Sequence, residues 1–214
     1  MKVHDIRVKQ QIRKMLLLLL RKQVILTFDD GPHLDYTPVI LDVLRDHKIN
    51  AVFFVVGERM QIGGAREVIR RASAEGHLIG NHGFSHVDMR KLSPDQIRTE
   101  ILRTSELIAE FEPRHPLFRP PYGALNSDVV KIVAELGYEM VLWNVDPQDW
   151  KPHRKPTAWV DAAVDQMRAR RKSICLCHDI QRTTLESLNL LVSRVKGIPR
   201  FQFVPYQTGI DEAN

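Results

Sequence analysis

Carboxylate and imidazole side chains form two short runs whose spacing suits metal binding. Asp29 and Asp30 follow an apolar run and precede a Gly-Pro turn, which can aim both carboxylates into one cleft. His82 and His86 lie four residues apart, a common spacing for two metal ligands on one helical face. Taken alone, each run has an ordinary alternative: a solvated Asp-Gly turn, or two unrelated histidines. Together, one carboxylate and two imidazoles leave open positions for water and substrate, and they suit Zn²⁺ or Fe(II).

Three further motifs carry side chains that could assist hydrolysis or bind a sugar. Arg119 precedes two prolines, and its rigid guanidinium fork suits a carboxylate partner. Asp146 and Asp149 stand beside Trp150, whose aromatic face could support a sugar ring. His178 ends an apolar run and could transfer a proton. Each also has a simpler interpretation, as a surface arginine, a core tryptophan or a hydrogen-bonded core histidine.

Seven short apolar runs, separated by amphipathic stretches, predict strands that alternate with helices. The expected strands span residues 24–28, 51–56, 78–81, 117–119, 138–144, 173–177 and 201–204. The expected helices span residues 37–46, 65–75, 94–111, 127–136, 157–169 and 184–195. This alternation indicates a parallel sheet, and seven units favour a closed or nearly closed barrel over an open doubly wound sheet. No glycine-rich phosphate loop follows the first strand, so a nucleotide-binding version lacks support.

Ionisable residues follow the first, third, fourth, fifth and sixth expected strands. In parallel β/α barrels, the active site is built at the carboxyl ends of the strands. We therefore expect the five motifs to meet at one rim of the barrel, although they lie far apart in the sequence.

Together the motifs resemble those of the NodB-type polysaccharide deacetylases, carbohydrate esterase family 4. The matching pieces occur in the family's order at residues 27–32 (TFDDGP), 82–86 (HGFSH), 119–123 (RPPYG), 146–150 (DPQDW) and 176–178 (LCH). The resemblance implies a single α/β domain that folds as a distorted (β/α)7 barrel. It places this catalytic domain at residues 24–210 and leaves residues 1–23 as an N-terminal extension.

The resemblance also implies an activity: metal-dependent removal of N-acetyl or O-acetyl groups from a carbohydrate such as chitin oligosaccharide or peptidoglycan, with release of acetate. Asp30, His82 and His86 would bind the divalent metal, with Zn²⁺ favoured over Co²⁺ or another transition metal. Asp29 would act as the general base and His178 as the general acid.

Five other residues have roles in the family pattern. Arg119 would position the base, and Asp149 would raise the pKa of the acid. The backbone N–H of Tyr122 would hold the oxyanion, while Trp150 and Leu176 would form the walls of the pocket for the acetyl methyl group.

Two other functions are open at this stage. A related hydrolase of a non-peptide C–N bond in a small cyclic amide would need the metal but would tolerate loss of the fourth and fifth motifs. A non-catalytic carbohydrate-binding protein on the same scaffold predicts loss of Asp29 or His178. The chain keeps all of these features, which favours the carbohydrate deacetylase.

Composition excludes some partners. The net charge is +5, but the basic residues are scattered among acidic ones and show no nucleic-acid-binding signature, so we expect no nucleic-acid partner. The apolar run at residues 15–20 is too short to span a bilayer, and no cleavage site follows it, which favours a cytoplasmic location. Cys175 and Cys177 lie two apart on an expected strand, at or beyond disulfide reach, and are expected to be free. Oligomeric state is left open.

Overall fold

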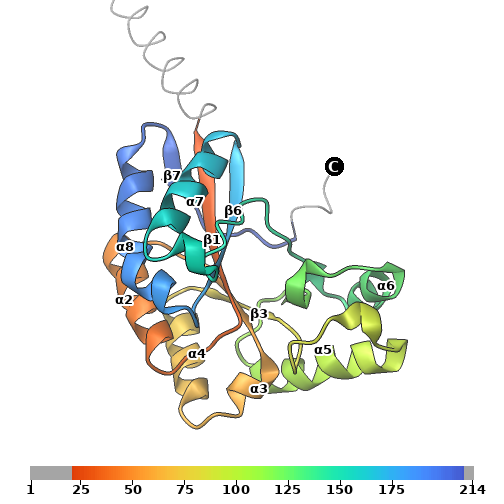
Figure 1. Cartoon of the computed structure of the whole chain (residues 1–214). Helices are drawn as coiled ribbons and strands as arrows, with labels where there is room; N and C mark the ends of the chain where they lie inside the picture. Colours follow the sequence, from red (N-terminus) through yellow and green to blue (C-terminus); the bar gives the residue numbers. More distant parts are fainter. Residues whose placement is uncertain (1–20, 210–214) are drawn as a thin grey trace, which may run out of the picture.

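The computed structural model describes residues 21–209, so the apolar run at residues 15–20 and most of the expected extension lie outside the described residues. Seven parallel strands form one sheet in this range (Figure 1). They are β1 (Lys22–Asp29), β2 (Val52–Val55), β3 (Leu78–Asn81), β4 (Leu117–Phe118), β5 (Glu139–Met140), β6 (Lys172–His178) and β7 (Phe201–Phe203). Their order is β5-β4-β3-β2-β1-β6, and β7 pairs with the first residues of β1.

The sheet curls until its two edges nearly meet. Val145, which follows β5, forms an isolated parallel bridge to Cys175 of β6. Two backbone hydrogen bonds hold this bridge, from the N–H of Val145 to the carbonyl of Ile174 at 3.1 Å and from the N–H of Leu176 to the carbonyl of Val145 at 2.9 Å. The prediction of a distorted, nearly closed (β/α)7 barrel is therefore confirmed.

The fifth strand is much shorter than the predicted range 138–144. Its regular part, β5, is two residues long. The reason lies in the next carbonyl groups, because those of Val141 and Leu142 accept hydrogen bonds from the Arg119 guanidinium, at 2.9 and 3.4 Å. These carbonyl groups thus face the Arg119 side chain, and Pro120, which follows on the β4 side, has no N–H with which to continue the strand ladder.

The helices agree with the predicted ranges to within three residues at each end. They are α2 (Tyr36–His47), α4 (Ala65–Ala74), α5 (Pro94–Ile108), α6 (Ser127–Glu135), α7 (Ala158–Arg168) and α8 (Arg182–Gly197). A short helix, α3 (Gly57–Met60), was not expected. The start of α5 is a capping box, since Ser93 and Gln96 exchange side chain–backbone hydrogen bonds. None of the helices within residues 21–209 has both the length and the apolar character needed to cross a lipid bilayer.

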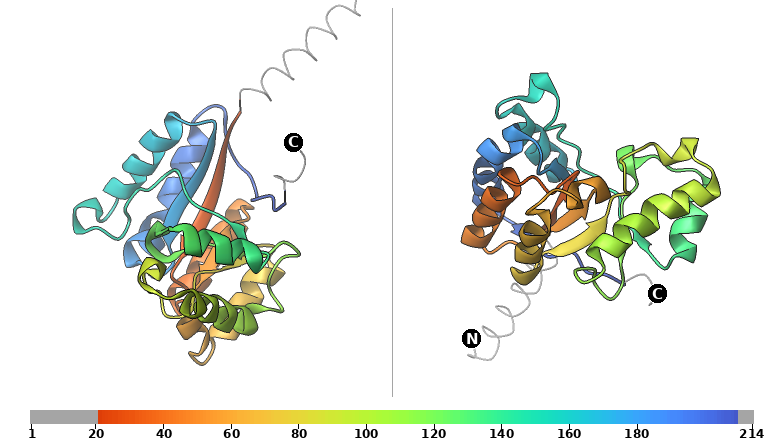
Figure 2. Two further views of the ribbon diagram at one scale, coloured as in Figure 1. Left: turned by 90° about the vertical axis from the view of Figure 1, so that its right-hand side faces the viewer. Right: turned by 90° about the horizontal axis from the view of Figure 1, so that it is seen from below.

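Two groups of helices cover different parts of the sheet. Helices α2, α7 and α8 lie together beside β1 and β6, whereas α5 and α6 lie beside β3 and β4 (Figures 1 and 2). The larger core packs beneath the first group and includes Phe28, Phe53 and Trp159. Cys175 and Cys177 point into this core, and both thiols are buried and free, as predicted.

Candidate metal centre and active site

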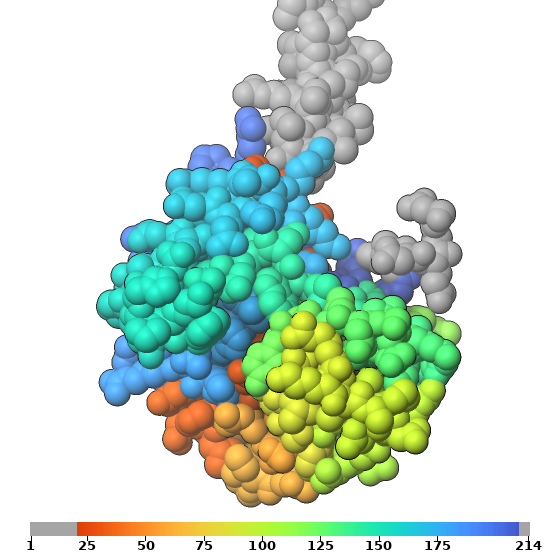
Figure 3. Space-filling model, turned by 45° about the vertical axis from the view of Figure 1, so that its right-hand side comes forward, coloured from red at the N-terminus to blue at the C-terminus, as the bar shows by residue number. Residues whose placement is uncertain are grey.

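A cleft of about 400 Å³ opens at the carboxyl ends of the strands, a size typical of small-ligand sites. In the space-filling view, the surface is hollowed between the teal and blue part of the chain and its green part (Figure 3). The predicted site residues that line the cleft are Asp29, Asp30, His82, His86, Tyr122, Trp150, Leu176 and His178. The other two, Arg119 and Asp149, are fully buried behind it. The structure thus brings together residues from all five motifs.

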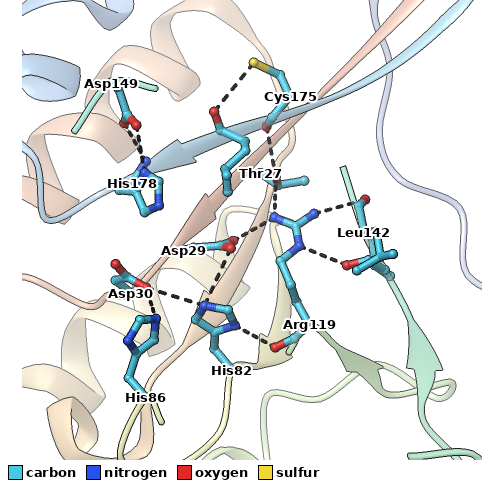
Figure 4. A network of polar contacts seen from close by, with 12 residues as sticks. Thr27, Asp29, Asp30, His82, His86, Arg119, Leu142, Asp149, Cys175 and His178 are labelled. Atoms are coloured by element: carbon cyan, nitrogen blue, oxygen red, sulfur yellow. Dashed lines mark hydrogen bonds and ion pairs between the residues drawn. The ribbon is translucent and has the colours of Figure 1, made fainter. Parts of the chain in front are cut away.

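The predicted metal ligands converge on one point. Oδ1 of Asp30 lies 3.0 Å from Nε2 of His86 and 3.4 Å from Nε2 of His82 (Figure 4). One ligand atom from each residue lies within 4.8 Å of the other two. Two imidazole nitrogens and one carboxylate oxygen, open to a cleft on one side, are the donor set of a catalytic divalent metal site. The residues present therefore fit such a metal.

Hydrogen bonds around these three residues favour the binding of a cation. Nδ1 of His82 lies 2.6 Å from the carbonyl oxygen of Arg119, and because a carbonyl can only accept, Nδ1 carries the hydrogen. Nε2 of His82 is then the ring nitrogen that faces Asp30 and would bind the metal. Burial alone would raise the pKa of Asp30, but hydrogen bonds and charge from His82 and His86 hold this pKa well below its usual range. Asp30 is therefore an ionised ligand.

Asp29 is fixed beside the metal ligands by a buried arginine. The side chain of Asp29 is almost fully buried, and its Oδ1 accepts a hydrogen bond from Nη1 of Arg119 at 2.7 Å. The same guanidinium also donates to Thr27 and to the carbonyl groups of Val141 and Leu142. These contacts hold the carboxylate in one orientation, with its Oδ2 3.6 Å from Nε2 of His82. An arginine buried in this way is tolerated because it is paired and hydrogen-bonded.

His178 is held by a second buried carboxylate. Nδ1 of His178 lies 2.7 Å from Oδ1 of Asp149, and the backbone N–H of His178 donates to Oδ2 at 2.8 Å. Thr184 also donates to Asp149. Burial alone would lower the pKa of His178, but the hydrogen bond and charge of Asp149, together with the charges of Asp29 and Asp30, raise it to about 9. His178 is therefore protonated at neutral pH, and its Nε2 is left to face the cleft.

The strand register places the two proton-carrying side chains next to each other. Asp29 ends β1 and His178 ends β6, and these residues are direct partners in the parallel ladder. Leu176 precedes His178 by two positions and lines the same cleft, whereas Cys177 points to the opposite side, as the alternation of a strand requires. A carboxylate and an imidazole thus flank the predicted metal ligands at the ends of neighbouring strands.

Comparison with known proteins agrees with this geometry. The family model described as polysaccharide deacetylase matches residues 19–141. This chain belongs to the polysaccharide deacetylase family. A chitooligosaccharide deacetylase of a Bradyrhizobium species is 40% identical over 164 residues, which cover 74% of this chain and 71% of that protein. A peptidoglycan-N-acetylglucosamine deacetylase of Bacillus cereus is 40% identical over 132 residues, which cover 61% of this chain.

The polysaccharide deacetylase fold extends over most of the chain. A solved T48 deacetylase with substrate superposes with a TM-score of 0.77 at 36% identity and covers 87% of this chain and 89% of that one. Curated relatives are longer in several cases, since the matched region spans only 47% of the Bacillus cereus protein. The family membership and the ligand set together support a divalent metal in this site.

Aromatic side chains form the mouth of the cleft. Tyr122 is 66% exposed, its ring lies 4.7 Å from that of His86, and its hydroxyl donates to the carbonyl of His86 at 3.3 Å. Trp150 is 47% exposed and is therefore not the core tryptophan of the alternative interpretation. Trp143 also lines the cleft but was not predicted, because it falls in the range 138–144 that was expected to be a strand. Exposed rings at the mouth of a cleft are suited to a sugar substrate.

Several buried or half-buried polar residues of the site gave no local signal in the sequence. Thr184 of α8 donates a hydrogen bond to Asp149, and Glu100 of α5 accepts one from the backbone of the loop that carries His86. Asp179 is buried next to the turn at Gly31, where burial raises its pKa to about 7. All three act across the fold, so only the tertiary structure shows their partners.

The Gly31→Ala substitution is expected to destabilise the protein by about 1–3 kcal/mol, because a methyl group at Gly31 would overlap both carboxylate oxygens of Asp179. Asp179 cannot easily withdraw, since it is buried and accepts a hydrogen bond from Thr37 at 2.5 Å. Urea unfolding measures the loss. Gly63→Ala is the matched control, because a Cβ at Gly63 meets nothing within 4 Å. Equal unfolding midpoints for the two variants would show that the turn accommodates a methyl group at position 31.

Proposed function

We propose that this chain is a metal-dependent hydrolase that removes N-acetyl groups from a carbohydrate, such as chitin oligosaccharide or peptidoglycan, and releases acetate. One observation carries the proposal: a three-residue metal site, an arginine-bound carboxylate and an aspartate-bound histidine share one cleft. Membership of the polysaccharide deacetylase family supports it, as do the names of the chitooligosaccharide and peptidoglycan deacetylases that the chain resembles.

Asp30, His82 and His86 would hold the metal, and their donor set favours Zn²⁺, with Co²⁺ or another transition metal as alternatives. A metal in such a site lowers the pKa of water and polarises a carbonyl oxygen, which a stable amide needs for hydrolysis. The proton transfers would be carried out by the side chains around these ligands.

Asp29 would act as the general base. It accepts the proton of the water that attacks the acetyl carbonyl, and Arg119 keeps its carboxylate aimed at the site. The tetrahedral intermediate carries a negative oxygen, and the backbone N–H of Tyr122 is the proposed donor to it.

His178 would act as the general acid. Its imidazolium, stabilised by Asp149, donates a proton to the nitrogen that leaves, so that the product is a neutral amine. Leu176 and Trp150 lie on the wall of the same cleft and are proposed to enclose the methyl group of the acetyl substituent. A small apolar enclosure of this kind selects acetyl over larger acyl groups.

The pH dependence of kcat/KM should show the role of Asp149. Because His178 must be protonated to act and its pKa is raised to about 9, activity is expected to fall as the pH rises through about 9. Asp149→Asn removes the negative charge that raises this pKa, so the alkaline fall should move to lower pH by about 1–3 units. Asp146→Asn is the matched control from the same motif, since Asp146 lines the cleft but bonds to Gln148 and not to His178. Identical profiles for both variants would exclude Asp149 from the tuning of the acid.

Acetate release from a set of substrates tests the proposed function itself. N-acetylglucosamine oligomers, peptidoglycan and acetylxylan would be incubated with the zinc-loaded protein, and a cyclic imide would represent the alternative C–N hydrolase. We expect acetate from at least one of the N-acetylated carbohydrates and no turnover of the imide. Turnover of the imide alone, or binding of sugar without acetate, would contradict the proposal.

A further inference from the structure

The loop between the two metal-binding histidines has a constrained backbone. Gly83 has a φ of 76° and His86 a φ of 53°, both in the left-handed region. A non-glycine residue adopts this region at a cost, and it stays there only where the surrounding structure fixes it. Helix α3 fixes one side of the loop, because the N–H groups of Gly57 and Glu58 donate to the carbonyls of Gly83 and Phe84 at 3.0 and 2.9 Å.

Glu100 of α5 fixes the other side of the loop. Its Oε2 accepts hydrogen bonds from the backbone N–H groups of Phe84 and Ser85, at 3.0 and 2.8 Å. Its Oε1 accepts a third, from the hydroxyl of Ser85 at 2.8 Å. The carboxylate is half-buried, and charge-assisted bonds of this kind are about twice as strong as neutral ones. Three donors within one short loop therefore converge on a single side chain from another element.

The two histidines differ in how their rings are oriented. The ring of His82 is held by its own hydrogen bond to the carbonyl of Arg119. In the part of the chain that the structure describes, Nδ1 of His86 has no hydrogen-bond partner, and the ring packs against those of Tyr122 and His82. The place of the His86 ring therefore depends on where the backbone of the loop lies, and Glu100 is a side chain that holds this backbone.

We propose that Glu100 is a positioning residue for the metal site, acting through the loop that carries His86. Its carboxylate does not touch the metal ligands but holds the N–H groups of the two residues before His86. The inference deepens the proposed function, because it rests on the same metal site. Residues that orient metal ligands typically change metal affinity by 10- to 100-fold when they are removed.

Zinc affinity of the metal-free protein tests this role without any substrate. Full-length protein would be titrated with Zn²⁺ in competition with a chromophoric chelator, for the parent and for Glu100→Ala, Glu100→Asp and Glu100→Gln. We expect Ala and Asp to weaken zinc binding about 10-fold or more, since neither reaches all three donors. Gln should stay within about threefold, because its oxygen can accept both N–H groups and its amide can donate to the Ser85 hydroxyl.

Glu106→Ala is the matched control on the same helix. Glu106 is exposed and forms no ion pair or side-chain hydrogen bond among the described residues, so its loss should leave zinc affinity unchanged. If Glu100→Ala does not fold, the more conservative Glu100→Asp decides. A folded Glu100→Asp with the affinity of the parent would overturn the proposal, as would an equal loss in Glu100→Gln. A protein that binds zinc as expected but releases no acetate would refute the proposed function and leave this result standing.

Discussion

Asp29→Asn is expected to reduce kcat for acetate release by about 10²- to 10⁴-fold while zinc remains bound. The amide cannot accept the proton of the attacking water, and general-base catalysis is worth about this factor. The side-chain oxygen of the asparagine can still accept the hydrogen bond from Arg119, so the buried guanidinium keeps a partner. Acetate assays and elemental analysis of the purified variant measure the two quantities separately.

The Asp29 experiment is informative because turnover and zinc content are measured separately. Loss of zinc together with activity would instead assign Asp29 to metal binding. Near-normal turnover in the variant would remove Asp29 from the mechanism. An unchanged melting temperature of the metal-free protein would show that the fold is intact.

His82→Ala is expected to abolish both zinc binding and turnover. The substitution removes one of three ligands and also leaves the carbonyl of Arg119 without the hydrogen bond that the imidazole donates. Zinc content after dialysis should fall from about one ion per chain to near zero. His47→Ala is the control, because His47 ends α2 and pairs with Asn189, away from the cleft. Zinc content in His82→Ala equal to that of the control would refute the ligand assignment.

The fold could be predicted in its main features because its signals are local. The apolar run of β2 and the amphipathic stretch of α5 are each contiguous in the sequence, and the structure has a strand and a helix where they were expected. The end of β5 could not be predicted in this way. It depends on the Arg119 guanidinium, which reaches the carbonyl groups of Val141 and Leu142 from a different strand.

The site shows the same division between local and long-range information. The motif residues could be selected because chemistry limits which side chains bind metals or move protons, and the rule for strand ends placed them at one rim. The residues that support them could not be selected from the sequence, since Glu100 and Thr184 are ordinary residues within helices. Only the packing of α5 and α8 against the rim gives these two side chains their partners.

A zinc titration of acetate release tests the central claim most directly. Protein stripped of metal with a chelator would be assayed on N-acetylglucosamine oligomers as Zn²⁺ is added back in small steps. With a single metal site made by Asp30, His82 and His86, the rate should start near zero, rise linearly and level off at about one ion per chain. The same rate in stripped and reloaded protein would show that these side chains do not hold a catalytic metal.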